Sequence, residues 1–125
     1  MSTVRDSDEY YDLLAHGRMP SSFPAGEVIF QQGVQGDCMY ILREGSVALK
    51  DGDRLVDTVA APGLFGEMAL IENEPRALAA VAATDVVLVE IPVRYFWVLV
   101  HETPYFAQLV MSVMAQRLRR QGGST

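Results

Sequence analysis

One segment, from Pro62 to Leu78, neither alternates like a strand nor continues long enough for an ordinary helix. We expect Met68 to Ile71 to wind a single helical turn. The first backbone N–H groups of such a turn lack intrahelical partners, and together with the helix dipole they favour an anion. Gly66 has no Cβ, so the backbone there can approach a ligand closely. The segment therefore predicts an anion-binding turn inserted between strands.

Two charged side chains, Glu67 and Arg76, flank this turn. The planar guanidinium of Arg76 offers a fork of donors that matches two oxygens of one phosphate. An ionised Glu67 can only accept hydrogen bonds, which suits a sugar hydroxyl. A cation, an acceptor and free amides are together the chemistry of nucleotide binding. The alternative is that the two side chains form a simple ion pair that stabilises the loop.

Short apolar runs separated by turn residues surround this segment and are typical of antiparallel strands. The strands are expected at residues 28–31, 39–42, 47–49, 55–60, 78–83 and 86–91. Many short strands with tight turns indicate a mainly β fold, an antiparallel, jelly-roll-like β-roll.

Helices are expected at both ends of the chain. Residues 6–16 have apolar side chains at helical spacing, with acids at the start and a glycine after the end. Pro92 is well placed to open a helix to about Val100, and Thr103 with Pro104 is typical of an N-cap followed by proline at the first helical position. The helix that follows is expected to end near Arg120.

The chain is therefore expected to form a single domain with three parts. These are an N-terminal helical segment over residues 1–20, a β-roll over 21–91 that contains the segment 65–78, and C-terminal helices over 92–120. The last helix carries one apolar stripe that should pack on the rest of the domain. Its members are Phe106, Leu109, Val110 and Val113.

Composition excludes several classes of protein. The 125 residues carry 10 Lys and Arg against 16 Asp and Glu, a net charge of −6, so no nucleic-acid partner is expected. Cys38 is the single cysteine and cannot form an internal disulfide, and no apolar run is long enough to insert in a membrane. These features predict a soluble, cytoplasmic domain.

No catalytic grouping is recognisable either. His16 and His101 are the only histidines and, with one cysteine, lack metal-site spacing, which argues against a metal-dependent cupin with a similar β-roll. A Ser-His-acid grouping or nucleophile motif is also missing from the pattern. We therefore expect no enzyme activity, no metal and no catalytic cofactor.

The segment also resembles a known motif. Phe65-Gly66-Glu67-Met68-Ala69-Leu70, with Pro75-Arg76-Ala77 nine positions after the glutamate, resembles the phosphate-binding cassette of the cyclic nucleotide-binding domain family. That family includes protein kinase A regulatory subunits, catabolite activator protein and cyclic-nucleotide-gated channels. The stretch 23–30 with Gly33 and Gly36-Asp37, and the stretch 39–47, are similar to it as well, so the resemblance covers about residues 20–118.

The resemblance implies a β-roll that holds a cyclic nucleotide. It implies Arg76 on the cyclic phosphate, Glu67 on the ribose 2′-hydroxyl, and backbone amides of the cassette around the phosphate. Because a buried arginine without its anion is costly, the loss of Arg76 should weaken binding far more than the loss of a surface arginine. The expected ligand-binding residues are Phe65, Gly66, Glu67, Met68, Ala69, Arg76, Ala77, Leu78 and Arg117.

Three positions bear on ligand choice and affinity. Ala77 has no hydroxyl where many members place Ser or Thr, and the adenine-preferring kinase regulatory domains also carry Ala there, which favours cAMP over cGMP. Leu78 is bulkier than the residue usual at its position, and it either points into the core or crowds the pocket. Arg117 either stacks on the base as part of a helical lid or is a solvated residue at a helix end.

These features predict a non-catalytic sensor for signal transduction, in which cAMP binding moves the flanking helices allosterically. The effector is expected to be another protein or a missing effector domain, because the sequence could be the sensor fragment of a larger regulator or channel. The rival prediction is a nucleotide-independent interaction module that docks or forms a homodimer through a Met-rich face with Met111 and Met114. In that module Leu78, or an Arg76–Glu67 pair, would fill the pocket.

Overall fold

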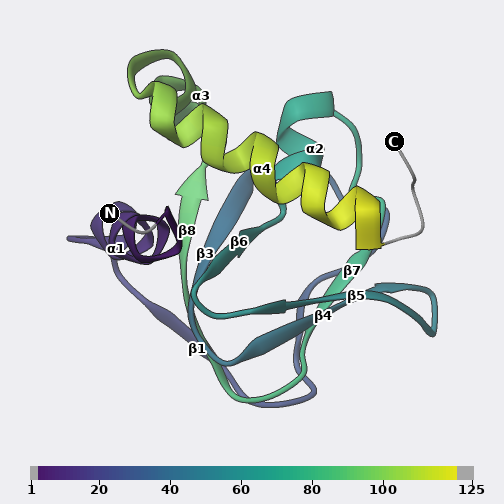
Figure 1. The fold of residues 1–125 in the computed structure, drawn as a ribbon. Coiled ribbons are helices and arrows are strands. Elements are labelled where there is room, and N and C mark those ends of the chain that lie inside the picture. Colours follow the sequence, from purple (N-terminus) through teal and green to yellow (C-terminus); the bar gives the residue numbers. More distant parts are fainter. Residues whose placement is uncertain (1–2, 121–125) are drawn as a thin grey trace.

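Two four-stranded antiparallel sheets, with helices on the outside, make up the computed structural model, which describes residues 3–120 (Figure 1). One sheet has the order β1-β8-β3-β6 and the other the order β2-β7-β4-β5. The elements in chain order are α1 (Thr3–Ala15), β1 (Ser21–Phe23), β2 (Val28–Phe30), β3 (Cys38–Glu44), β4 (Ser46–Asp51), β5 (Arg54–Ala60), β6 (Gly63–Phe65), α2 (Glu67–Glu72), β7 (Ala79–Ala82), β8 (Val86–Pro92), α3 (Val93–Glu102) and α4 (Pro104–Arg120).

The predicted β-roll with flanking helices is confirmed, and each of the six predicted strands overlaps an observed one. Two strands were not predicted, β1 and β6, each of three residues. Such short strands show no alternation, and only their partners define them: β1 pairs with β8, and β6 pairs with β3 through Tyr40 and Phe65. The segment that was expected to interrupt the strands therefore begins with a strand.

Strand β3 of the first sheet is buried on both faces, because it lies between the helices and the second sheet. Met39 and Ile41 of β3 belong to a core cluster with the helices, whereas Tyr40 and Leu42 belong to a cluster with the second sheet. The five residues from Cys38 to Leu42 are therefore all buried. This explains why the sequence of β3 is continuously apolar rather than alternating.

Helix α4 follows α3 after a single residue, Thr103, and crosses over α2 and the sheets (Figure 1). Of the predicted apolar stripe, Phe106, Leu109 and Val110 are buried, and Val113 is partly buried against the same core cluster. Helix α4 begins at Pro104 directly after Thr103, as predicted, although the Thr103 hydroxyl donates to the Leu99 carbonyl of α3 at 2.5 Å and not to an amide of α4. The same Leu99 carbonyl accepts the backbone N–H of Thr103 at 2.9 Å, so both donors of Thr103 close the last turn of α3.

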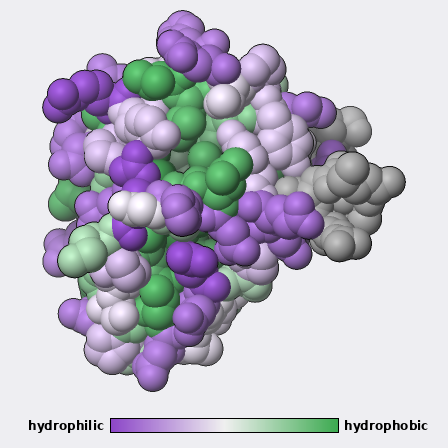
Figure 2. Space-filling model, turned by 90° about the vertical axis from the view of Figure 1, so that its left-hand side faces the viewer, coloured by the Kyte–Doolittle hydropathy of each residue, from purple (hydrophilic) through white to green (hydrophobic). Residues whose placement is uncertain are grey.

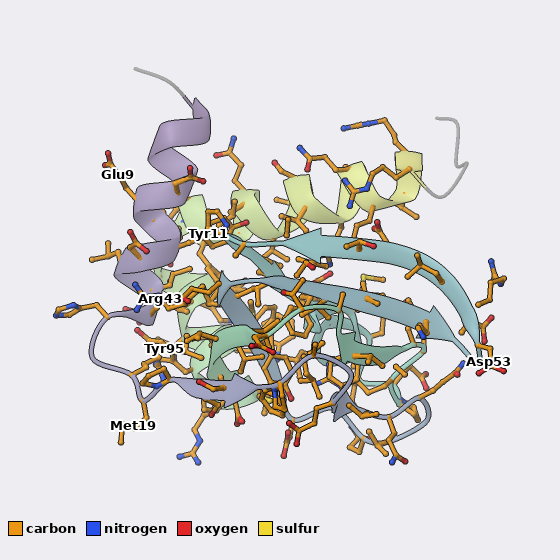
Figure 3. All side chains as sticks on the ribbon, turned by 90° about the horizontal axis from the view of Figure 1, so that it is seen from below. Glu9, Tyr11, Met19, Arg43, Asp53 and Tyr95 are labelled. Atoms are coloured by element: carbon orange, nitrogen blue, oxygen red, sulfur yellow. The ribbon has the colours of Figure 1, made fainter. Side chains whose placement is uncertain are left out.

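The side of the molecule that carries α1 has hydrophobic side chains gathered in the middle of the face, framed by hydrophilic ones (Figure 2). The turn between β4 and β5, with Asp53, lies at the opposite end from α1 (Figure 3). Between these two ends the strands run across the middle of the view, and α4 lies along one edge of it (Figure 3).

Gly45, at the turn between β3 and β4, is the glycine most tightly enclosed by backbone. Its φ is 88°, and a Cβ there would lie 2.2 Å from the Asp85 carbonyl oxygen. Gly52 also has a positive φ, 61°, but a Cβ there would meet no atom within 4 Å. An alanine at Gly52 would therefore suffer backbone strain alone, whereas an alanine at Gly45 would suffer both strain and steric overlap.

We expect Gly45→Ala to lower the free energy of unfolding by at least about 3 kcal/mol, because strain and overlap add. Gly52→Ala is the matched control and should cost only about 1–2 kcal/mol, the strain alone. Urea denaturation followed by circular dichroism measures both. Equal losses in the two variants would contradict the packing described at Gly45.

Candidate functional site

A cavity of about 390 Å³ lies between α2, the second sheet and the C-terminal half of α4. The first turn of α2 forms part of its wall, and the residue before it, Gly66, has a left-handed φ of 84° with no side-chain cap on the helix. The lining residues are Phe30, Leu49, Arg54, Val56, Gly66, Glu67, Met68, Ala69, Glu72, Arg76, Ala77, Leu78, Met114, Arg117 and Leu118. The predicted anion-binding turn therefore borders a cavity.

Arg76 is a buried cation without an acidic partner among the described residues. Its side chain is held by two backbone carbonyls, since Nη1 donates to Gly66 and Nη2 to Cys38, both at 2.6 Å. The guanidinium carbon lies 4.0 Å from the centroid of the Phe30 ring, a cation–π contact. Nε is buried and has no hydrogen-bond partner. The guanidinium is thus fixed in position while it retains unused donors.

Two glycines make room for this guanidinium. A Cβ at Gly66 would lie 3.0 Å from Nη1 of Arg76, and a Cβ at Gly36 would lie 3.0 Å from its Cζ and 2.8 Å from the Ala69 Cβ. Gly66 was predicted to let the backbone approach a ligand closely, whereas Gly36 was not predicted as a site residue. The contact of Gly36 with Arg76 joins positions 40 residues apart, which local sequence patterns do not reveal.

Glu67 is fully buried and forms its ion pair with Arg117 of α4, not with Arg76. Nη1 of Arg117 donates to both carboxylate oxygens at 3.1 Å, and Nη2 donates to the Leu64 carbonyl. The alternative of a Glu67–Arg76 ion pair is therefore wrong. The alternative of a solvated Arg117 is also wrong, because its side chain is only 12% exposed.

Most of the other predicted residues also line the cavity. Met68, Ala69, Ala77 and Leu78 do so, and Leu78 packs against the core of the second sheet as well. The cavity remains open, so Leu78 does not fill it. Phe65 does not line it: its ring stacks on Tyr40, with centroids 4.9 Å apart, in the core behind the site. The role of each residue in binding stays a prediction.

Several lining residues were not predicted because they come from distant elements. Phe30 lies on β2, Leu49 on β4, Val56 on β5, and Met114 and Leu118 on α4. They form the apolar part of the wall, and the ring of Phe30 also lies against the Arg76 guanidinium. Among the described residues, no group of three or more His, Cys, Asp or Glu could hold a metal ion.

This arrangement has the chemistry of a site for a small anionic ligand with an apolar part. The fold of the chain and the segment 65–78 together define a β-roll of the cyclic-nucleotide-binding type. A family model described as the cyclic nucleotide-binding domain matches residues 20–103, and the chain belongs to that family. The resemblance found in the sequence is therefore confirmed.

Relatives of known type support the assignment. The cAMP-dependent protein kinase regulatory subunit of Eremothecium gossypii is 49% identical over 63 residues, which cover 50% of this chain and 14% of that protein. A cyclic nucleotide-gated potassium channel of Rhizobium etli is 36% identical over 104 residues, which cover 83% of this chain and 28% of the channel. The chain thus spans less than a third of the length of either relative.

The fold is also similar to a solved structure. The catabolite activator protein of Thermus thermophilus matches with a TM-score of 0.74 and 29% identity over 90% of this chain and 55% of that one.

Among the helices described here, none is long and apolar enough to cross a membrane.

Cys38 lies behind the site, where its carbonyl holds Arg76, and burial raises the pKa of its thiol to about 11. Because the thiolate is the reactive form, we expect iodoacetamide to alkylate Cys38 at pH 8 at least about 100-fold more slowly in the folded domain than in urea. Mass spectrometry of timed samples measures this ratio. Comparable rates in the two states would show that the thiol is accessible and ionised.

Proposed function

We propose that this domain is a non-catalytic sensor that binds cAMP in preference to cGMP. The observation that carries the proposal is the buried Arg76, which is fixed by carbonyls and has no acidic partner among the described residues. A buried unpaired cation is costly, so an anion that enters the cavity recovers much of that cost. A cyclic phosphate supplies the single negative charge needed.

The remaining walls suit the other parts of a cyclic nucleotide. In the proposed complex Arg76 and the first amides of α2 bind the phosphate, and Glu67 accepts a hydrogen bond from the ribose 2′-hydroxyl. The purine lies against the apolar lining. A volume of about 390 Å³ is within the usual range of small-ligand pockets, roughly 300–1,000 Å³.

Two considerations support cAMP as the ligand. Ala77 lines the cavity and provides no hydroxyl for a guanine. The names of related proteins point the same way: a CRP-like cAMP-activated transcriptional regulator of Mycobacterium tuberculosis is 30% identical over 81% of this chain and 47% of its own length. A solved structure described as cAMP-bound PfPKA-R matches with a TM-score of 0.73 and 27% identity, over 98% of this chain and 44% of that one.

In the proposed mechanism α4 reports whether the cavity is occupied. It contributes Met114, Arg117 and Leu118 to the lining, so a ligand that changes these contacts changes the helix. Such coupling requires that the ligand bind two arrangements of α4 with different affinity. The effector that responds is another protein or a further domain of a larger regulator or channel.

The rival module has little support. Its two expected features were a cavity filled by Leu78 and an Arg76–Glu67 pair, and the described residues show neither. The proposed Met-rich face is also divided, since Met111 is 62% exposed while Met114 lines the cavity. Ligand binding is therefore the function that we propose.

Calorimetric titration with cAMP and cGMP, after removal of any co-purified nucleotide, tests this proposal. We expect tighter binding of cAMP, and a loss of at least about 100-fold in Arg76→Gln, because the phosphate loses a charge-assisted, forked partner. Arg94→Gln, which changes an exposed arginine outside the cavity, is the matched control and should bind normally. If the unaltered domain binds neither nucleotide, the proposed function is wrong.

Amide hydrogen exchange with and without cAMP tests the role of α4. We expect slower exchange over residues 104–120 in the presence of cAMP, because the ligand adds contacts to the face of α4 that lines the cavity. Exchange in β3, which is buried in both core clusters, serves as an internal reference. Identical protection of α4 in the two states would exclude it as the reporting element.

A further inference from the structure

An ion pair between Arg120 and Asp57 joins the last turn of α4 to strand β5. Nη2 of Arg120 donates to Oδ2 of Asp57 at 2.9 Å, and Nε donates to Oδ1 at 3.3 Å. Oδ1 also accepts the backbone N–H of Thr58 at 2.8 Å. The Asp57 side chain is 8% exposed and that of Arg120 is 51% exposed, so water reaches the pair mainly from the Arg120 side. Asp57 is thus a well-held point to which the end of the helix is attached.

An irregularity in β5 allows Asp57 to meet α4. In the register of β4 with β5, residues 49 and 50 pair with residues 57 and 55, so Val56 is left without a partner. Adjacent side chains of a regular strand point to opposite faces of the sheet, whereas an extra residue of this kind re-aims a side chain. Val56 lines the cavity and Asp57 contacts the helix. The strand therefore supplies both a wall of the cavity and the attachment point beside it.

The ion pair lies beside the mouth of the cavity. Leu118 of α4 and Arg54 of β5 both line the cavity and are both exposed. Because exposed lining residues mark where a cavity meets solvent, one part of the opening lies between the end of α4 and β5. Arg120 is two residues beyond Leu118, and Asp57 directly follows the lining residue Val56. The pair therefore joins the two walls at this part of the opening.

The pair is separate from the contacts that shape the site. Asp57 and Arg120 lie beside the lining residues rather than among them. Without the pair, α4 is still attached through Arg117, which contacts Glu67 and the Leu64 carbonyl. A contact that is equally strong in the free and the occupied domain does not shift a binding equilibrium. If that contact must break on the path of the ligand, it raises the barriers to entry and to exit by the same amount.

We propose that the Arg120–Asp57 ion pair is an electrostatic gate, which opens when a ligand passes between α4 and β5 and so sets the rates of binding and release more than the affinity. This inference rests on the proposed function, because the ligand that passes is cAMP. Salt screens an ion pair that water reaches, whereas it acts less on the buried Arg76. The gate therefore opens more readily as the salt concentration rises.

Stopped-flow fluorescence with a fluorescent cAMP derivative measures both rate constants, and calorimetric titration with cAMP measures the affinity. We expect Arg120→Gln to raise the association and dissociation rate constants alike, by about three- to fivefold, the equivalent of one half-exposed ion pair. The dissociation constant for cAMP should change by less than about twofold. Arg119→Gln removes the same charge from the neighbouring exposed position and is the matched control, with both rates unchanged. Added KCl should speed release from the unaltered domain more than from Arg120→Gln.

A second variant tests whether the two side chains act together. Asp57→Asn loses the charge but keeps an acceptor for the Thr58 N–H, so it should raise both rates as Arg120→Gln does. The double variant should match either single variant, because all three lack the same contact. If Asp57→Asn does not fold, Arg120→Gln carries the test, since it alters a half-exposed side chain.

Three results would overturn the inference. They are unchanged rates in Arg120→Gln, a salt response of release equal to that of the unaltered domain, and faster release with a matching loss of affinity, which would make the pair part of the binding contacts. Failure of the proposed function is seen separately, as no binding of cAMP by the unaltered domain, and the gate is then wrong with it.

Discussion

A buried positive charge without an acidic partner among the described residues is the constraint around which the site is built. Arg76 is 5% exposed, and such a cation is stable only if its surroundings offset the loss of water. Two carbonyls and the face of Phe30 provide part of that compensation, and Gly36 and Gly66 leave the space for it. The remainder is what an anionic ligand can supply. The domain therefore keeps a buried cation whose loss of hydration is only partly compensated, and the two packed sheets hold that cation in place.

The second constraint is that one helix serves both the core and the cavity. The first half of α4 packs Phe106 and Leu109 into the core cluster beneath the helices, whereas its second half places Met114 and Arg117 at the cavity. A ligand that displaces Met114 or Arg117 would thus act on a helix whose other end is fixed by packing in the core. The electrostatic contacts of the last turn, including that of Arg120 with Asp57, are less buried than the core contacts and are therefore easier to exchange.

The sequence predicted the features that are local in the chain and missed those that depend on distant contacts. The cassette could be recognised because Glu67 and Arg76 lie within one short segment and their chemistry is specific. The pairing of Glu67 with Arg117 joins residues 50 apart. The sequence suggested instead a pair of Glu67 with Arg76, and for Arg117 either a lid over the base or a solvated helix end. Strand β6 was missed for a related reason: three residues carry no periodic pattern, and pairing with β3 defines them. The roles of Phe30 and of the Cys38 carbonyl follow from how the strands pack, which no local pattern encodes.

The single-residue junction between α3 and α4 also has a mechanical consequence. With Thr103 as the pivot, the 17 residues of α4 form a rigid lever about 25 Å long. A tilt of about 10° would displace Phe106, close to the pivot, by less than about 1 Å, which side-chain packing can absorb. The same tilt would carry the far end at Arg120 through about 4 Å. Met114, Arg117 and Leu118 line the cavity near that far end, so a tilt that begins at a bound ligand would move the end of α4 by a similar distance, large enough for another surface to detect, while the core near the pivot would stay almost unchanged.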